Sequence, residues 1–140
     1  VVTGVASFTG TDQVTVDGQS FTAKRFVIAT GSAAWIPPIK GLQATSFLTN
    51  EDMFSLPELP QSMIVLGGGP VGVEKAQAYA RLGTKVTIIE LAPRLIPRMD
   101  AEASKILSEV LREEGVSIVV GNEVLEVSES QIDGQVAQKQ

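Results

Sequence analysis

The chain of 140 residues contains no cysteine and no histidine. Without cysteine it forms no disulfide, offers no thiolate nucleophile and holds no cysteine-based metal site. Without histidine it lacks the side chain that most often acts as a general base near neutral pH. We therefore expect no catalytic residue and no metal site in this chain itself.

Positive charge is also scarce, because 11 lysines and arginines face 16 acidic residues and the net charge is −5. Nucleic acids and acidic membranes attract proteins through clustered positive charge, so we expect neither as a partner. No apolar run reaches the roughly 18 residues of a membrane-spanning helix. The first residues lack the basic and long apolar segments of a secretory signal, so a cytoplasmic location is the default expectation.

The most informative stretch is Met63–Glu90. Its four apolar residues Met63–Leu66 predict a strand buried on both faces of a parallel sheet. After three glycines, Pro70 suits the first turn of a helix, where its missing N–H would have no partner. This helix is expected to run to about Leu82. The alternation of Lys85–Ile89 then predicts a second strand.

The glycines between strand and helix have the spacing of a dinucleotide-binding turn. Gly67 permits the tight turn, Gly69 lets a pyrophosphate approach the backbone, and Gly72 lets the helix lie close to the strand. The helix N-terminus attracts phosphate, and Glu90 at the end of the second strand can accept a hydrogen bond from a ribose 2′-OH. A glycine-rich turn of another α/β domain is the alternative. The predicted nucleotide contacts are Gly67, Gly69, Pro70, Val71, Gly72 and Glu90.

The choice between NAD and NADP depends on the residues at and after Glu90. Its carboxylate would repel a 2′-phosphate and therefore favours NAD. Arg94 and Arg98 follow within the next loop and could reach such a phosphate, or they could simply be solvated. NAD is the expected nucleotide, and NADP stays open.

The N-terminal part predicts β structure. An antiparallel meander is expected over residues 1–23, with turns at Thr9–Asp12 and Asp17-Gly18. A buried strand is expected over Phe26–Ala29, ending at Gly31-Ser32.

Between this part and the central stretch we expect a short helix, and after the stretch a longer helix, a strand and an added meander. Asp100 is the expected cap of the longer helix, whose apolar stripe should lie in the core. The whole pattern predicts an α/β fold with a Rossmann-like domain of parallel strands. The expected segments are the helices Glu51–Leu56 and Ala101–Glu114, the stripe Ile106, Leu107, Val110 and Leu111, the strands Val116–Val120 and Glu123–Val127, and a turn at Asp133-Gly134.

With these elements in place, the chain resembles a middle part of the flavin-dependent pyridine nucleotide–disulfide oxidoreductases. It is most similar to the mercuric-reductase-like and dihydrolipoamide-dehydrogenase-like members of that family. The resemblance implies that residues 1–47 end an FAD-binding domain and that residues 48–140 form most of an NAD(P)-binding domain, truncated before its last strand. The matching segments are Gly4–Phe8, Val27–Ser32, Pro37–Leu42, Gly67–Glu90 and Ala92–Arg98.

The resemblance also implies roles for single residues. Ala6 would offer its backbone to the adenine of FAD, and Thr30 with Gly31 would pass close to the flavin nucleotide. Glu74 matches a glutamate that pairs with a lysine beside the flavin, although a carboxylate in the first helical turn is also explained by the helix dipole. Pro70 replaces a tyrosine that covers the flavin in some relatives.

The activity implied is hydride transfer from NAD(P)H to FAD, and then to a dithiol and a disulfide or metal-ion acceptor. The redox cysteines, the FAD-domain glycine motif and the dimerisation domain of the family are not in this chain, so it should not be catalytically competent alone. The alternative is a non-catalytic NAD(H)-binding module for regulation or sensing. Strands that have lost their neighbours should also promote self-association.

Overall fold

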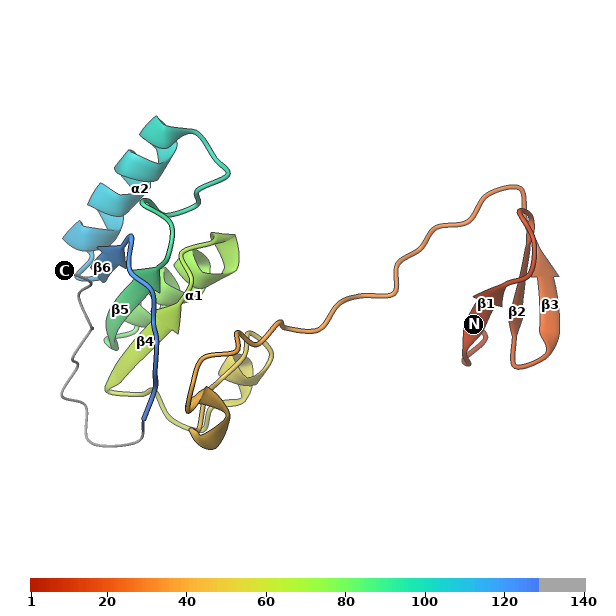
Figure 1. Ribbon diagram of the computed structural model, residues 1–140, viewed down its shortest axis with the longest axis horizontal. Helices are drawn as coiled ribbons and strands as arrows, with labels where there is room; N and C mark the ends of the chain where they lie inside the picture. Colours follow the sequence, from red (N-terminus) through yellow and green to blue (C-terminus); the bar gives the residue numbers. More distant parts are fainter. Residues whose placement is uncertain (129–140) are drawn as a thin grey trace. The chain divides into compact units, whose positions relative to one another are not determined.

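The computed structural model describes residues 1–128, which form a mixed α/β protein, as the sequence predicts (Figure 1). The chain divides into two compact units, Val1–Ala33 and the part that begins at Ala34. The elements in chain order are β1 (Ala6–Phe8), β2 (Gln13–Val16), β3 (Gln19–Thr22), η1 (Leu42–Ala44), η2 (Asp52–Ser55), β4 (Ser62–Leu66), α1 (Pro70–Arg81), β5 (Lys85–Glu90), α2 (Ala101–Glu113) and β6 (Ser117–Val120).

The first unit contains the predicted antiparallel meander, with the order β1-β2-β3. Val16 pairs with Gln19 across the turn, and Asp17 and Gly18 have φ angles of 47° and 84°. Positive φ at both central residues is what a two-residue type I′ hairpin requires. The Asp17 carboxylate also accepts a hydrogen bond from the N–H of Val5, at 3.3 Å, which ties the first residues to this turn.

The buried strand expected over Phe26–Ala29 does not form. These residues have no strand hydrogen bonds, and Val27 and Ile28 are 91% and 74% exposed. A strand needs a neighbour to accept and donate its backbone hydrogen bonds. None of the strands described in residues 1–128 pairs with this segment, so its high β propensity has no sheet to join. Its Phe26 ring instead meets the Phe8 ring edge to face, with centroids 5.1 Å apart.

The second unit is built on a parallel sheet with the order β4-β5-β6 (Figure 1). Val65 lies beside Ile88, and Ile88 beside Ile118, so these side chains share one face. They belong to the same hydrophobic cluster as Ala76 of α1 and Leu111 of α2. Both helices therefore pack on that face of the sheet, and the core lies between helices and strands.

Strand β4 is not buried on both faces, which corrects the prediction from its apolar sequence. Met63 and Val65 pack toward the helices, whereas Ile64 is 55% exposed and Leu66 is exposed. The reason is that β4 lies at one edge of the sheet and both helices cover the same face. In residues 1–128 the opposite face of β4 has no covering layer, although its sequence would suit one.

Helix α2 begins as predicted, since the Asp100 carboxylate accepts hydrogen bonds from the N–H groups of Glu102 and Ala103. Its predicted apolar stripe is only half right. Leu111 is fully buried and Leu107 is partly buried, but Ile106 is 54% exposed. Val110 is exposed as well, while Ser104, which the stripe did not include, is buried.

A polar contact accompanies this rotation of α2. The Ser104 hydroxyl donates to the carbonyl of Leu95 at 2.7 Å, so this serine can be buried without leaving a polar group unpaired. The face that contains Ser104, Leu107 and Leu111 is the face turned toward the core. Ile106 and Val110 are displaced toward solvent.

Hydrogen bonds join the segment before β4 to α1 and to the residue that precedes β5. The expected short helix is a 3-10 helix, η2, in which the Asp52 carboxylate accepts from the N–H and hydroxyl of Thr49. These two hydrogen bonds lower the pKa of Asp52 from its ordinary value. The Tyr79 hydroxyl donates to the carbonyl of Met53 at 2.6 Å, and the Thr84 hydroxyl donates to that of Pro60 at 2.8 Å.

The two helices are joined at their C-terminal ends by a polar network. The Glu114 carboxylate accepts from the guanidinium of Arg81 and, at 2.9 Å, from the side-chain amide of Gln77. The hydrogen bond to Arg81, followed by that to Gln77, holds the pKa of Glu114 below its ordinary value. This network joins two segments that are distant in the sequence.

After β6 the predicted strand Glu123–Val127 is not formed. Glu126 makes one isolated parallel bridge to Lys40, supported by an ion pair of 3.0 Å. The predicted turn at Asp133-Gly134 lies outside the described residues. Within residues 1–128, no helix combines the length and apolar character needed to cross a membrane.

Candidate functional site

The glycine loop connects β4 directly to α1. Gly67 has a φ of 105°, a conformation that favours glycine, and its N–H donates to the carbonyl of Ile89 at 2.8 Å. Gly69 is the extended N-cap of α1, and Pro70 is its first helical residue. The chain thus leaves the carboxyl end of β4 and starts a helix within three residues, as the glycine spacing predicts.

Gly69 and Gly72 differ in the space around them. A Cβ atom added to Gly72 would overlap the carbonyl oxygen of Gly67, so only glycine lets α1 start this close to β4. A Cβ added to Gly69 would meet no atom within 4 Å. This open side is where a phosphate could approach the start of α1, where N–H groups lack partners inside the helix.

Glu90 lies at the end of β5 against the glycine loop. One carboxylate oxygen accepts from the N–H of Gly68 at 2.5 Å, and the other accepts from the N–H of Ala92 at 2.7 Å. A carboxylate can accept about four hydrogen bonds, so these two contacts leave acceptor sites for ribose hydroxyls. The structure therefore brings the predicted acid and the predicted glycines together at the carboxyl ends of parallel strands.

The prediction from sequence missed Gly68 and the two residues that hold it, Leu95 and Ile96. Gly68 is buried, and a Cβ on it would come 2.5 Å from the nearest Leu95 methyl carbon. The N–H of Ile96 donates to the carbonyl of Gly68 at 2.7 Å. The only sequence signal for this contact is the presence of a third glycine at a position that the dinucleotide-binding spacing leaves free.

The two arginines of the loop after Glu90 differ in how free their side chains are to bind a phosphate. The Arg94 guanidinium donates to the carbonyls of Pro97 and Met99, at 2.9 and 3.2 Å, so it holds the loop itself. Arg98 is exposed, and no hydrogen bond or ion pair joins it to the other described residues.

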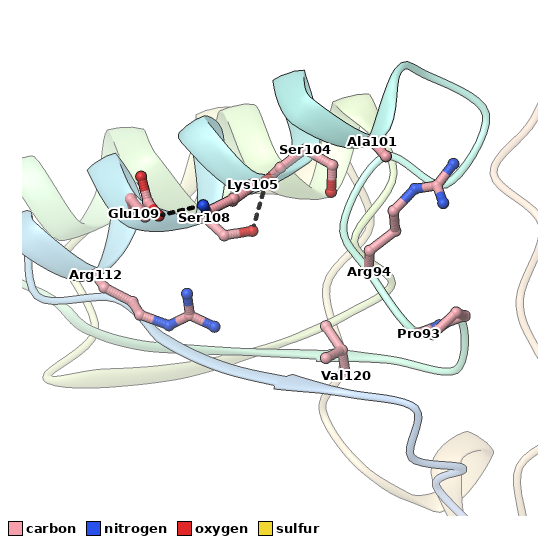
Figure 2. Close-up of a pocket in the computed structure, with 9 residues that line it drawn as sticks. All are labelled: Pro93, Arg94, Ala101, Ser104, Lys105, Ser108, Glu109, Arg112 and Val120. Atoms are coloured by element: carbon pink, nitrogen blue, oxygen red, sulfur yellow. Dashed lines mark hydrogen bonds and ion pairs between the residues drawn. The ribbon is translucent and has the colours of Figure 1, made fainter.

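A pocket of about 310 Å³ lies along α2, between that helix, the loop after β5 and β6 (Figure 2). Figure 2 shows its ion pair between Lys105 and Glu109 and the hydrogen bond of the Ser108 hydroxyl to Ser104. Neither the glycine loop nor Glu90 lines it, so it is separate from the candidate site.

The remaining predicted residues lie on α1 or in the first unit. Val71 and Glu74 are exposed on α1, and Glu74 makes no hydrogen bond or ion pair within residues 1–128. Ala6 is in β1, and Thr30 and Gly31 follow the meander without regular structure. These last three belong to the unit Val1–Ala33, whereas the glycine loop belongs to the unit that begins at Ala34.

A strand, a glycine turn, a helix and a parallel strand that ends in an acid form a β-α-β unit with the Rossmann-like fold. The chain belongs to the pyridine nucleotide-disulphide oxidoreductase family, whose model matches residues 1–140. The family implies a pyridine nucleotide and FAD as its cofactors. These findings confirm the resemblance noted from the sequence.

Individual relatives agree with this assignment. The chain is 36% identical to the mercuric reductase of Bacillus cereus over 121 residues, which is 86% of this chain and 19% of that protein. It is 38% identical to a dihydrolipoyl dehydrogenase of Bacillus subtilis over 84% of this chain and 27% of that protein. The chain therefore spans about a fifth to a quarter of these two relatives.

Solved structures show the same similarity. The HOCl-induced flavoprotein disulfide reductase RclA from Escherichia coli matches with a TM-score of 0.73 and 33% identity. That match covers 91% of this chain and 30% of the RclA chain. The water-forming NADH oxidase from Lactobacillus brevis matches in fold, with a TM-score of 0.64 and 24% identity over 85% of this chain and 29% of that one.

Proposed function

We propose that this chain is the nucleotide-binding segment of a flavoprotein disulfide oxidoreductase. Residues 48–140 are assigned to its NAD(P)-binding domain and residues 1–47 to the end of its FAD-binding domain. The observation that carries the proposal is the contact of the Glu90 carboxylate with the N–H of Gly68, beside the open side of Gly69. This arrangement combines a phosphate-binding helix start with an acceptor for ribose hydroxyls.

In this proposal the chain binds and orients the pyridine nucleotide that supplies hydride to FAD. The backbone of Gly69 and the first turn of α1 bind the pyrophosphate. Pro70 fixes the backbone conformation at the start of the helix, and Val71 provides the first helical N–H. Glu90 takes the adenosine ribose. The chain contains no cysteine, so the dithiol that passes electrons to a disulfide or a metal ion must lie elsewhere in the parent protein. The chain alone is not expected to catalyse the reaction.

Contacts to the flavin are proposed for a second group of residues. Ala6 would contact the adenine of FAD, and Thr30 and Gly31 would lie near the flavin nucleotide. Glu74 would pair with a lysine beside the flavin. The absence of a partner for Glu74 within the described residues supports this role, because an exposed carboxylate is available to a cation from another part of the parent.

Calorimetric titration with NADH and, separately, NADPH tests the site. NADH is expected to bind more tightly, because Glu90 repels a 2′-phosphate and Arg94 is occupied by loop carbonyls. Glu90→Ala should weaken NADH binding by about tenfold or more, because hydrogen bonds to a charged group contribute roughly 1.5–3 kcal/mol. Glu113→Ala, which removes an exposed carboxylate at the end of α2, is the matched control.

The possible results separate the proposals. Binding of neither nucleotide by the unaltered chain would refute a functional site in it. Tighter binding of NADPH would assign the site to NADP instead. The absence of cysteine and histidine also suits a non-catalytic NAD(H)-binding module for sensing. That alternative would gain support if the intact gene encoded no Cys-x-x-x-x-Cys segment.

Self-association is proposed on the basis of exposed apolar β structure. Ile64 and Leu66 lie exposed on edge strand β4, and Val27 and Ile28 are exposed in a segment that pairs with no strand of residues 1–128. Such edges and faces promote pairing between chains. Light scattering coupled to size exclusion is expected to show a mass that rises with concentration. A constant monomer mass over a wide concentration range would contradict the proposal.

A further inference from the structure

The loop of residues 91–99, here called the 91–99 loop, holds the centre of the glycine loop. The carbonyl of Gly68 accepts from the N–H of Ile96 at 2.7 Å, and the N–H of Gly68 donates to Glu90 at 2.5 Å. Both backbone polar groups of Gly68 are therefore used by the chain between residues 90 and 96. A phosphate needs hydrogen-bond donors, and the one backbone donor of Gly68, its N–H, is already bonded to Glu90, so Gly68 has a role in holding the loop rather than in binding.

Leu95 fills the space that a side chain at position 68 would need. It is fully buried, and its methyl carbon would lie 2.5 Å from a Cβ at Gly68. The carbonyl of Leu95 accepts from the buried hydroxyl of Ser104 at 2.7 Å. A continuous series of contacts thus runs from α2 through Leu95 to the glycine loop.

Ile96 is held in a strained conformation. Its φ is 40°, which is unfavourable for a β-branched residue. The conformation is supported on both sides, by the hydrogen bond to Gly68 and by the N–H of Met99, which donates to the carbonyl of Ile96 at 2.8 Å. Arg94 adds hydrogen bonds to the carbonyls of Pro97 and Met99. Strained residues that are supported in this way concentrate at ligand clamps and active sites.

We propose that Gly68, Leu95 and Ile96 form a clamp that sets the glycine loop in the orientation that receives a pyrophosphate. Leu95 and Ile96 are positioning residues, because they act through the backbone of Gly68 and not on the ligand. The inference rests on the proposed function, since the ligand is the pyridine nucleotide. It also explains why position 68 is glycine here, although the dinucleotide-binding spacing accepts other residues there.

A rescue experiment tests the clamp in the full 140-residue chain. Gly68→Ala should push Leu95 and Glu90 aside and weaken NADH binding by about tenfold or more, because the added methyl group overpacks the space beside Leu95. Leu95→Val removes the terminal carbons that would collide with the new methyl group and alone should weaken binding less. The double variant should recover most of the affinity lost in Gly68→Ala. Gly10→Ala, in the first unit with no atom closer than 3.7 Å to the added Cβ, is the matched control.

Amide hydrogen exchange provides a second measurement that does not depend on the ligand. The Ile96 amide should be protected in the unaltered chain, exposed in Gly68→Ala and protected again in the double variant, while α2 amides stay protected in all three. An unprotected Ile96 amide in the unaltered chain would overturn the clamp whether or not NADH binds. If the unaltered chain binds NADH, equal affinity in Gly68→Ala would overturn the clamp alone. Absence of binding by the unaltered chain would overturn the proposed function.

Discussion

Gly69→Ala is expected to abolish measurable binding of NADH while the chain stays folded. A Cβ at this position has no protein atom within 4 Å, and the φ of −72° suits alanine, so the fold accepts the change. The methyl group would stand on the open side of the loop, where we propose that the pyrophosphate approaches the backbone. Losing two charge-assisted hydrogen bonds of roughly 1.5–3 kcal/mol each weakens binding about a hundredfold or more.

Calorimetry with NADH measures this effect, and thermal unfolding followed by circular dichroism measures stability. An alanine in place of glycine at an N-cap costs at most about 1 kcal/mol, so the unfolding midpoint should change little. Undiminished NADH binding by Gly69→Ala would contradict the assignment of the pyrophosphate to this loop. Loss of the fold in this variant would instead contradict the open space that the structure shows beside Gly69.

Gly72→Ala is expected to have the opposite pattern and to destabilise the second unit. Alanine is favoured over glycine inside a helix by about 1 kcal/mol. At Gly72 this gain is exceeded, because the new Cβ would overlap the carbonyl oxygen of Gly67 and lie 3.3 Å from a methyl carbon of Val65. Overpacking costs typically about 1–3 kcal/mol, and more where backbone has to move, so we expect a net loss of about 2 kcal/mol.

Thermal unfolding is the measurement, and a loss of about 2 kcal/mol corresponds to a midpoint lower by roughly 5–10 °C for a chain of this size. Gly69→Ala is the matched control, because it makes the same chemical change three residues earlier, at the N-cap of α1, where space is available. NADH binding by Gly72→Ala should also fall, since α1 can relax only by moving away from β4. An unchanged midpoint would show that the start of α1 tolerates a side chain and would refute the steric role of Gly72.

Gly69 and Gly72 show which features can be predicted from the sequence and which cannot. Their spacing after an apolar run predicts a strand, a turn and a helix, and the structure has β4 and α1 at those positions. The sequence rules assign both glycines to the turn for different reasons. The steric reason at Gly72 is visible in the structure, whereas the role of Gly69 toward a ligand stays a prediction.

Other predictions failed where burial depends on distant parts of the chain. The sequence of β4 is apolar enough for a strand covered on both faces, yet the described residues cover only one face. Phe26–Ala29 has strong β propensity, but no strand within residues 1–128 lies beside it. The apolar residues of α2 suggest one buried face, but the structure buries Ser104 instead of Ile106 and Val110, with the Ser104 hydroxyl bonded to the carbonyl of Leu95.

The sequence by itself shows that cysteine and histidine are absent. It also determined the order of the main elements and the strand, glycine turn and acid of the candidate site. Each depends on composition or on residues close together in the chain, where local sterics and hydrogen bonding act. Only the tertiary structure decided which faces of β4 and α2 are buried, and that Leu95 and Ile96 hold Gly68. Those two residues lie more than twenty positions from Gly68, and no local pattern specifies which distant side chain fills a given space.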